Sequence, residues 1–300
     1  MESFTANIEE VRAANLRERA LAFLELTKPR IAILLVLSSA AGFYMASSSG
    51  FEPLLFIHSM VSITLLAFGV STLNQYIERF IDPMMERTAE RPLPTGRVTP
   101  SEALIFGIVQ CVLAELYLLL FVNALTALLG LVVIVGYVLL YTPMKTRTSL
   151  STVVGAIPGA MPPLMGWTAA SNNITVVAWA LFASQFLWQF PHFLSIAWLY
   201  RHQYAQAGIK MLPVVEPSGK LTGRQIVLFS IMLLPISLAP YFFQVSGLIF
   251  LVGASLLGIC FLWASIQAAR TRSDEMARKL LLVSVIYLPL FFLLMVIDKV

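Results

Sequence analysis

The chain has 300 residues, 58% of them hydrophobic and only 12% charged, with a formal net charge of +4. Ordinary globular domains carry about 25% charged residues, so this composition excludes a pair of soluble domains. It predicts one polytopic membrane domain over residues 1–300, surrounded by a lipid bilayer and without a nucleic-acid partner. Cys111 and Cys260 both lie in apolar runs, which argues against a disulfide framework.

The first 30 residues precede the apolar stretch that begins at Ile31. They contain five acidic residues, which argues against a mitochondrial presequence, and they lack the apolar core of a signal peptide. Residues 7–27 could form an amphipathic helix on the membrane surface. A solvated cytoplasmic tail is the alternative, and both interpretations stay open.

Nine apolar segments follow, each long enough to cross a bilayer as a helix. They are residues 31–48, 54–80, 101–122, 125–141, 150–170, 175–199, 225–244, 247–268 and 277–297. Every Lys and Arg except Lys299 lies in the N-terminal segment or in and beside the loops after the second, fourth, sixth and eighth segments. The positive-inside rule therefore predicts a cytoplasmic N-terminus and a C-terminus outside.

Three polar residues, Asn74, Glu78 and Asp82, lie four residues apart at the end of the second segment. On an α-helix, positions i, i+4 and i+8 share one stripe. Carboxylates suit Mg²⁺, which one or two of them usually hold together with substrate phosphates, and guanidinium groups suit the remaining phosphate oxygens. Four arginines follow the stripe: Arg79, Arg87, Arg91 and Arg97. The pattern predicts a diphosphate site at the mouth of a membrane protein.

Part of this pattern has a simpler interpretation. Asp82 could cap a short helix that Pro83 begins, and the arginines could bind anionic lipid. That interpretation leaves Asn74 and Glu78 unexplained, because polar and ionisable groups inside a bilayer are costly and usually functional. The diphosphate site is therefore favoured.

The segment 74–97 reads NQYIERFIDPMMERTAERPLPTGR and resembles the first signature of the intramembrane prenyltransferases. Within that family the chain resembles the branch that farnesylates protohaem IX, the haem O synthases, since other branches more often have Asp at the position of Glu78. Further matches are LTKPR at 26–30, YTPMKTRTSLSTVVGAIPGAMPPLMGW at 141–167, WQFPHFLSIAW at 188–198, YAQAGIKMLPVV at 204–215 and ARKLLLVSVIYLPLFF at 277–292. Together these segments cover most of the chain.

The resemblance implies nine transmembrane helices around a central cavity, open to the cytoplasmic side of a bacterial inner membrane. It implies transfer of a farnesyl group from farnesyl diphosphate to a vinyl group of protohaem IX, with addition of water, giving haem O and diphosphate. The catalytic residues would be Asn74, Glu78 and Asp82 with Mg²⁺, and Arg87 and Arg91 would bind the diphosphate. An association with a haem A synthase or a terminal-oxidase assembly would fit that product.

The other cytoplasmic loops supply three weaker candidates. Lys145 and Arg147 in loop 142–149 would add charge to the diphosphate pocket, although positive-inside loops hold such residues anyway. Many members of the family read Glu-Asp-Tyr where this chain has His202, Gln203 and Tyr204, so the carboxylate expected at a second Mg²⁺ is missing. Gln203 can offer a carbonyl oxygen without the charge, which makes it a weak metal ligand.

His192 lies in the sixth segment, eleven residues before Gln203 and about 16 Å deeper along a helix. Imidazole is a usual ligand of haem iron, and haem is the acceptor that the resemblance implies. His192 is therefore a haem-binding hypothesis, beside a cavity-lining role and a plain hydrogen bond to a neighbouring helix. For Glu115, in the third segment, a structural role in the bundle is favoured over a place in the cavity.

Two other functions are weaker alternatives. A prenyltransferase for another aromatic or quinone-precursor acceptor would keep the diphosphate site, but Glu78 and the PHF motif at 191–193 count against it. A small-molecule transporter would place polar groups on both sides of the midplane or show an inverted repeat, whereas the charged residues here gather on one face.

Overall fold

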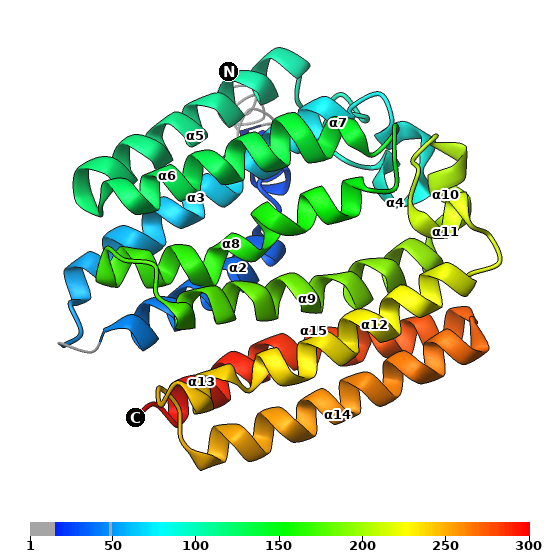
Figure 1. Cartoon of the computed structure of the whole chain (residues 1–300). Coiled ribbons are helices and arrows are strands. Elements are labelled where there is room, and N and C mark those ends of the chain that lie inside the picture. Colours follow the sequence, from blue (N-terminus) through cyan, green and yellow to red (C-terminus); the bar gives the residue numbers. More distant parts are fainter. Residues whose placement is uncertain (1–15, 48–49) are drawn as a thin grey trace, which may run out of the picture.

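The computed structural model describes residues 16–47 and 50–300, and every regular element within them is helical (Figure 1). The long helices are α2 (Pro29–Ala46), α3 (Pro53–Glu78), α5 (Pro100–Phe121), α6 (Ala124–Ile134), α8 (Ser151–Ser171), α9 (Val176–Leu199), α12 (Lys220–Ser237), α14 (Leu248–Thr271) and α15 (Asp274–Ile297). The short elements are η1 (Asp82–Met84), α4 (Glu86–Ala89), η2 (Val135–Tyr141), α7 (Thr142–Met144), α10 (Arg201–Gln206), α11 (Leu212–Val215) and α13 (Ala239–Phe242). The long helices form one bundle, and α4, α7, α10 and α11 gather at one of its ends.

Seven stretches in the described part of the chain are long and apolar enough to cross a membrane. They are Pro29–Ala46, Pro53–Glu78, Pro100–Phe121, Ala124–Met144, Lys220–Phe242, Leu248–Thr271 and Asp274–Ile297. Helices α8 and α9 have 21 and 24 residues but do not belong to this set. Their composition explains why, because α8 contains glycines and three prolines, and α9 contains two glutamines and a histidine. The all-helical membrane class is confirmed, and crossing by α8 and α9 stays a prediction.

Helix α8 is built for contact with other helices rather than with lipid. Pro163 has no N–H to donate to the carbonyl of Gly159, as a helix would require. The side-chain amide of Gln185, on α9, donates to that carbonyl instead at 2.8 Å. The GAIPGAMPPLMGW segment at 155–167 thus serves the packing of α8 on its neighbours.

Helices α2 and α8 approach each other so closely that their backbones touch. A Cβ atom placed on Gly166 would lie 1.8 Å from the carbonyl oxygen of Ser39, and one on Gly42 would lie 2.1 Å from the carbonyl oxygen of Pro163. Small residues permit this kind of approach between membrane helices. The two glycines therefore fix the position of α2, whose first residue follows Lys28.

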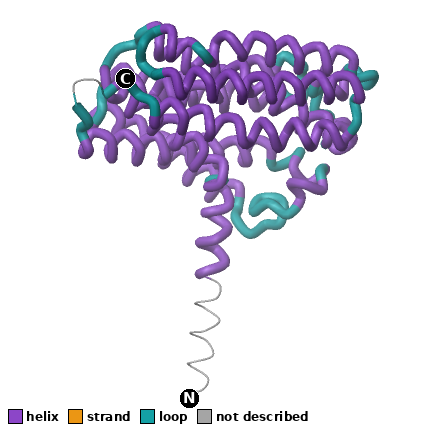
Figure 2. Tube along the Cα trace, turned by 90° about the horizontal axis from the view of Figure 1, so that it is seen from below, coloured by secondary structure: helices purple, strands orange, loops and turns teal. Residues whose placement is uncertain are grey.

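The segment 16–26 is helical and projects away from the bundle of long helices (Figure 2). Two ion pairs hold it against the bundle: Arg19 lies 2.5 Å from Glu102, and Glu25 lies 2.8 Å from Arg97. The part of the expected surface helix that precedes residue 16 lies outside the described residues.

Substitution of Gly166 tests the backbone contact between α2 and α8. We expect Gly166→Ala to lower the free energy of unfolding by about 1–3 kcal/mol or more, because the new methyl group meets a backbone carbonyl that cannot rotate away. Thermal unfolding of the detergent-solubilised protein measures the change. Gly136→Ala is the control, since its Cβ would meet Pro158 at an ordinary 3.5 Å. Equal stability of the two variants would contradict the contact.

Candidate active site

The end of α3 and the turn after it bring three polar side chains together in a buried position. Asn74, Glu78 and Asp82 are only 1%, 7% and 0% exposed. Helix α3 ends at Glu78, and Asp82 begins η1, where Pro83 suits the first turn. The predicted stripe is thus completed across a turn rather than along one helix. Asp82 is fully buried.

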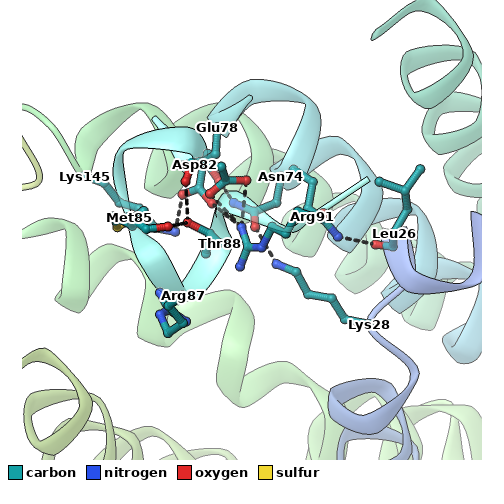
Figure 3. Close-up of polar contacts among 12 residues, drawn as sticks. Leu26, Lys28, Asn74, Glu78, Asp82, Met85, Arg87, Thr88, Arg91 and Lys145 are labelled. Atoms are coloured by element: carbon teal, nitrogen blue, oxygen red, sulfur yellow. Dashed lines mark hydrogen bonds and ion pairs between the residues drawn. The ribbon is translucent and has the colours of Figure 1, made fainter. Parts of the chain in front are cut away.

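Arg91 covers both carboxylates from the loop after α4. Its Nη1 lies 2.8 Å from each carboxylate oxygen of Asp82 and 3.8 Å from Oε2 of Glu78. Thr88 fixes the same loop, because its hydroxyl donates to the carbonyl of Asp82 at 2.8 Å. Figure 3 shows Arg91 lying against the carboxylates. Hydrogen bonds between a guanidinium and a carboxylate are among the strong ones in proteins, so this loop is held firmly.

Lys145 reaches Glu78 from the opposite side of the site. It follows α7, and its Nζ lies 2.5 Å from Oε1 of Glu78 and 4.5 Å from the ring centroid of Tyr141. Burial, the largest influence, would lower the pKa of Lys145, but the Glu78 carboxylate together with the Tyr141 and Tyr137 side chains outweighs burial and holds this pKa above its usual range. Lys145 is therefore a fixed positive charge. Tyr141 ends η2, a π-helical turn of a kind that often occurs at functional sites.

Lys28 belongs to the site although the sequence pattern did not indicate it. Its Nζ donates to Oδ1 of Asn74 at 2.9 Å, and Nδ2 of Asn74 donates to the hydroxyl of Thr142 at 3.1 Å. Burial, and after it the Arg91 guanidinium, lower the pKa of Lys28 to about 7. Its φ of 50° is rare for a residue other than glycine and is typical of strained functional positions. The available signal was a lysine directly before Pro29 at the start of an apolar segment.

Arg87 lies at the edge of the site and connects its loop to α10. Its guanidinium donates to the hydroxyl of Tyr204 at 3.3 Å and lies 5.1 Å from the ring centroid of Tyr200. Its backbone N–H donates to Oε1 of Gln203 at 3.3 Å. The carbonyl oxygen proposed as a weak metal ligand is thus engaged in holding two loops together. Arg147 is exposed on the loop after α7.

Three half-buried cations, Lys28, Arg91 and Lys145, surround two buried carboxylates, and we call these five side chains with Asn74 the charged cluster (Figure 3). The cations outnumber the carboxylates, and burying an unmatched charge is costly. The pKa of Lys28 is low because its charged form is destabilised by burial and by the neighbouring Arg91. An anion that carries several negative charges would relieve this cost, so the cluster is suited to bind one.

The oxygen atoms of the cluster suit a hard divalent cation. Glu78 and Asp82 offer carboxylates, and Asn74 offers an amide oxygen, the donor types that Mg²⁺ prefers. Burial raises the pKa of Asp82 even though Arg91 binds both its oxygens, so this carboxylate would gain from a further positive charge. No group of three or more His, Cys, Asp or Glu side chains among the described residues could hold a metal ion alone. The donor set therefore fits a cation that also binds phosphate oxygens, because these would complete its coordination.

The two polar residues that the sequence marked inside apolar segments, Glu115 and His192, lie in the bundle apart from the charged cluster. Glu115 of α5 packs against Gly130 of α6, since a Cβ on Gly130 would lie 2.4 Å from Oε1 of Glu115. That oxygen has no hydrogen-bond partner among the described residues. His192 of α9 is half-buried, and its Nδ1 lies 2.8 Å from the hydroxyl oxygen of Ser284 on α15.

Comparison with known proteins relates the chain to membrane prenyltransferases. The sequence profile of the UbiA prenyltransferase family matches residues 35–295. A relative in Solibacter usitatus named protoheme IX farnesyltransferase is 46% identical, and the alignment covers 92% of this chain and 98% of the relative. Relatives of the same name in Salinibacter ruber and Myxococcus xanthus are 42% and 39% identical, and the alignments cover 92% and 96% of this chain and 98% of each relative.

Solved structures share the fold at low sequence identity. A structure of digeranylgeranylglyceryl phosphate synthase has a TM-score of 0.76 at 18% identity, over 94% of this chain and 98% of that one. A UbiA homologue from Archaeoglobus fulgidus bound to GPP and Mg²⁺ has a TM-score of 0.67 at 17% identity, over 91% and 99% of the two chains. These similarities establish the helical arrangement.

Lys28 offers a test of the charged cluster as an anion site. We expect Lys28→Ala to weaken the binding of inorganic diphosphate in the presence of Mg²⁺ by about tenfold, because a hydrogen bond to a charged group contributes about 1.5–3 kcal/mol. Isothermal titration of the purified protein measures the affinity. Arg30→Ala removes the same charge from an exposed position two residues away and should leave the affinity unchanged. Equal losses in both variants would mean that general attraction, not the cluster, binds the anion.

Proposed function

The chain belongs to the UbiA prenyltransferase family, and from this premise we propose how the charged cluster divides the work of catalysis. The reaction transfers a farnesyl group to a vinyl group of protohaem IX and, with addition of water, gives haem O. A prenyl diphosphate and haem are the substrates of this multi-pass membrane protein. One observation carries the assignment of the site: two carboxylates and three cations meet in one buried position at the end of α3.

The cations of the cluster bind the diphosphate of the donor, farnesyl diphosphate. Ion pairs within the protein hold Arg91 and Lys145 beside Glu78 and Asp82, so they do not have to be ordered during the reaction. Negative charge grows on the diphosphate as its bond to the allylic carbon breaks. Positioned positive charges that meet this growing charge lower the barrier by several kcal/mol. Arg87, at the edge of the cluster, supplies a further guanidinium.

Asn74, Glu78 and Asp82 would hold Mg²⁺, which would neutralise part of the charge on the leaving diphosphate. Their oxygen atoms already face the cations of the cluster, as the contacts of Glu78 with Lys145 and of Asp82 with Arg91 show. Gln203 remains a weak candidate for this role, because its carbonyl oxygen accepts a hydrogen bond from Arg87. Arg147 is exposed and would contribute only long-range charge at the entrance.

The apolar surroundings of the cluster protect the cation left on the prenyl group. Once the diphosphate has left, the electron-rich vinyl group of the haem attacks the allylic carbon. Water then adds to the resulting cation on the haem side and loses one proton to the solvent, which leaves the hydroxyl group of the product. A bundle that is apolar below the cluster keeps water away from the first of these steps.

All nine long helical segments would cross the membrane, with the charged cluster on the cytoplasmic side of a bacterial inner membrane. Helices α8 and α9 are long enough to do so, at 21 and 24 residues. All Lys and Arg residues except Lys299 lie in the N-terminal segment or near the bundle end that holds the cluster, which supports a cytoplasmic N-terminus and an outward C-terminus. Segment 16–26 would lie on the cytoplasmic surface. Assembly with a haem A synthase or a terminal oxidase would deliver the product.

The acceptor and the class of protein follow from the relatives rather than from the cluster. A diphosphate site would serve any prenyl acceptor, so the cluster alone does not distinguish haem from an aromatic acid or a quinone precursor. The relatives described above carry the name protoheme IX farnesyltransferase at 39–46% identity, which favours haem. Nothing in the comparisons favours a transporter.

Removing the carboxylates tests the catalytic role of the cluster. We expect Glu78→Gln and Asp82→Asn each to reduce prenyl transfer by about 100-fold or more, because the metal loses a negatively charged ligand and the cations that bind the diphosphate lose the carboxylate that holds them. Cells that lack haem O synthesis, complemented with each variant, can be assayed by mass spectrometry of their extracted haems. Glu90→Gln changes an exposed carboxylate in the same loop and should remain active. Near-normal haem O with either cluster variant would refute the assignment.

Substitutions at Gln203 distinguish two roles of this residue, binding a metal ion and holding the loop of Arg87. Gln203→Glu keeps the oxygen that accepts from Arg87 and adds a charge, so we expect it to remain active and to need less Mg²⁺ for half-maximal rate. Gln203→Leu removes the hydrogen bond and should raise the KM for farnesyl diphosphate several-fold. The Mg²⁺ dependence of the rate is the measurement. A severe loss in Gln203→Glu would show that the neutral amide is required.

A further inference from the structure

The hydrogen bonds around His192 fix which of its ring nitrogens carries the proton. Ser284 has a single hydroxyl proton, and it donates this proton to the carbonyl of Leu281, which can only accept, at 2.6 Å. The Ser284 oxygen lies 2.8 Å from Nδ1 of His192 and must therefore accept in that contact. Nδ1 consequently carries the proton, and Nε2 of the neutral ring keeps its lone pair.

Trp188 holds the same imidazole from one face. Its ring stacks on that of His192 at 4.7 Å between centroids and an interplanar angle of 19°. Its indole N–H donates to the carbonyl of Ser284 at 2.8 Å. Trp188 and His192 are thus both fastened to one residue of α15, so the ring can neither rotate nor flip freely.

The lone pair of Nε2 is left for a ligand inside the bundle. Nε2 has no hydrogen-bond partner among the described residues, although the ring is only half-buried. Every side chain of α9 from Ala180 to Leu199 is buried or half-buried, and α9 packs against α8, α12 and α15. The His192 ring therefore lies where α9 meets its neighbours, beside α15. The site therefore offers a fixed, neutral nitrogen donor in an apolar interior.

We propose that Nε2 of His192 binds the iron of the haem acceptor, and that Ser284 and Trp188 are positioning residues for this bond. The proposal rests on the proposed function, which supplies haem as the substrate. The Nε2 lone pair forms a coordinate bond to iron at an open axial position, or replaces a water molecule there, with no change of oxidation state and no proton transfer. A histidine that binds a metal usually donates its other N–H to a fixed acceptor, and Ser284 supplies that acceptor.

The position of His192 along α9 agrees with a haem that reaches the charged cluster. From His192 to the last residue of the helix, Leu199, the rise is about 10 Å. The next residue, Tyr200, lies beneath the guanidinium of Arg87 at the edge of the cluster. Iron bound at His192 would place one edge of the porphyrin toward the cluster, where the vinyl group has to meet the allylic carbon.

Comparison of protohaem IX with metal-free protoporphyrin IX tests the iron bond. Both porphyrins are titrated into the full-length protein in detergent, and the Soret band is followed. We expect the wild type to bind protohaem at least about tenfold more tightly than the metal-free ring, with the spectrum of an imidazole complex. His192→Ala should abolish this preference and the spectrum, and added imidazole should restore the band. His58→Ala is the control, because His58 pairs with Tyr117 near the start of α3.

Ser284 provides the test of positioning. Ser284→Ala should weaken protohaem binding by about 10- to 100-fold, as loss of such partners of metal ligands does, and should leave protoporphyrin binding unchanged. Ser284→Thr retains the hydroxyl and should restore the wild-type affinity. A merely structural role would weaken both porphyrins alike.

Two results would overturn the proposal: an unchanged haem spectrum in His192→Ala, or equal binding of the two porphyrins by the wild type. Prenyl transfer by the wild-type protein is assayed in parallel. Wild-type transfer with an unchanged His192→Ala spectrum refutes only the iron bond. Absence of transfer to haem by the folded wild type would refute the proposed function itself.

Discussion

The pairing of Glu78 and Asp82 with Arg91 and Lys145 is the interaction on which the active end of the molecule depends. A carboxylate removed from water without a partner is strongly destabilising, and loss of one member of a buried pair costs about 3–5 kcal/mol. Here the partners come from separate parts of the chain, Arg91 from the loop after α4 and Lys145 from the end of α7. The pairs therefore fix the relative positions of α3, that loop and α7. A ligand finds the charges already in place.

In the middle of the bundle, close packing between helices stabilises α8 and α9, whose sequences are less apolar than those of the other long helices. Gly42 and Gly166 let the backbones of α2 and α8 touch, and Gln185 satisfies a carbonyl that Pro163 leaves without its usual donor. Residues of this kind lower the hydropathy of α8 and α9, yet both helices are as long as those around them. The contact also sets the start of α2 and with it Lys28, so helix packing and the geometry of the charged cluster are connected.

The sequence revealed those parts of the site whose residue types are unusual for their surroundings. Asn74, Glu78 and Asp82 stood out because polar groups are rare in apolar segments, and their spacing correctly predicted that they lie together. Lys28 could not be recognised in this way, since a lysine is ordinary at the end of a membrane helix and its partner is 46 residues away. The partnership of His192 with Ser284 is also invisible in the sequence, because a serine in α15 has no feature that marks it. Local patterns thus predicted the all-helical membrane class and the grouping of these three residues, whereas contacts between distant segments required the fold.

Helix α9 connects the edge of the charged cluster with the position of His192. The residues that follow it, Gln203 and Tyr204, hold Arg87 at the edge of the charged cluster, and His192 lies within it, fastened to α15 through Ser284. A prenyl transfer needs the acceptor carbon held against the carbon that loses diphosphate, and such positioning can supply several kcal/mol of the barrier. A rigid helix that carries contacts to both substrates would set that distance through its own rise. The prolines and glycines of α8 then have a purpose beyond packing, because they let α8 lie close enough for Gln185 to hold α9 in place.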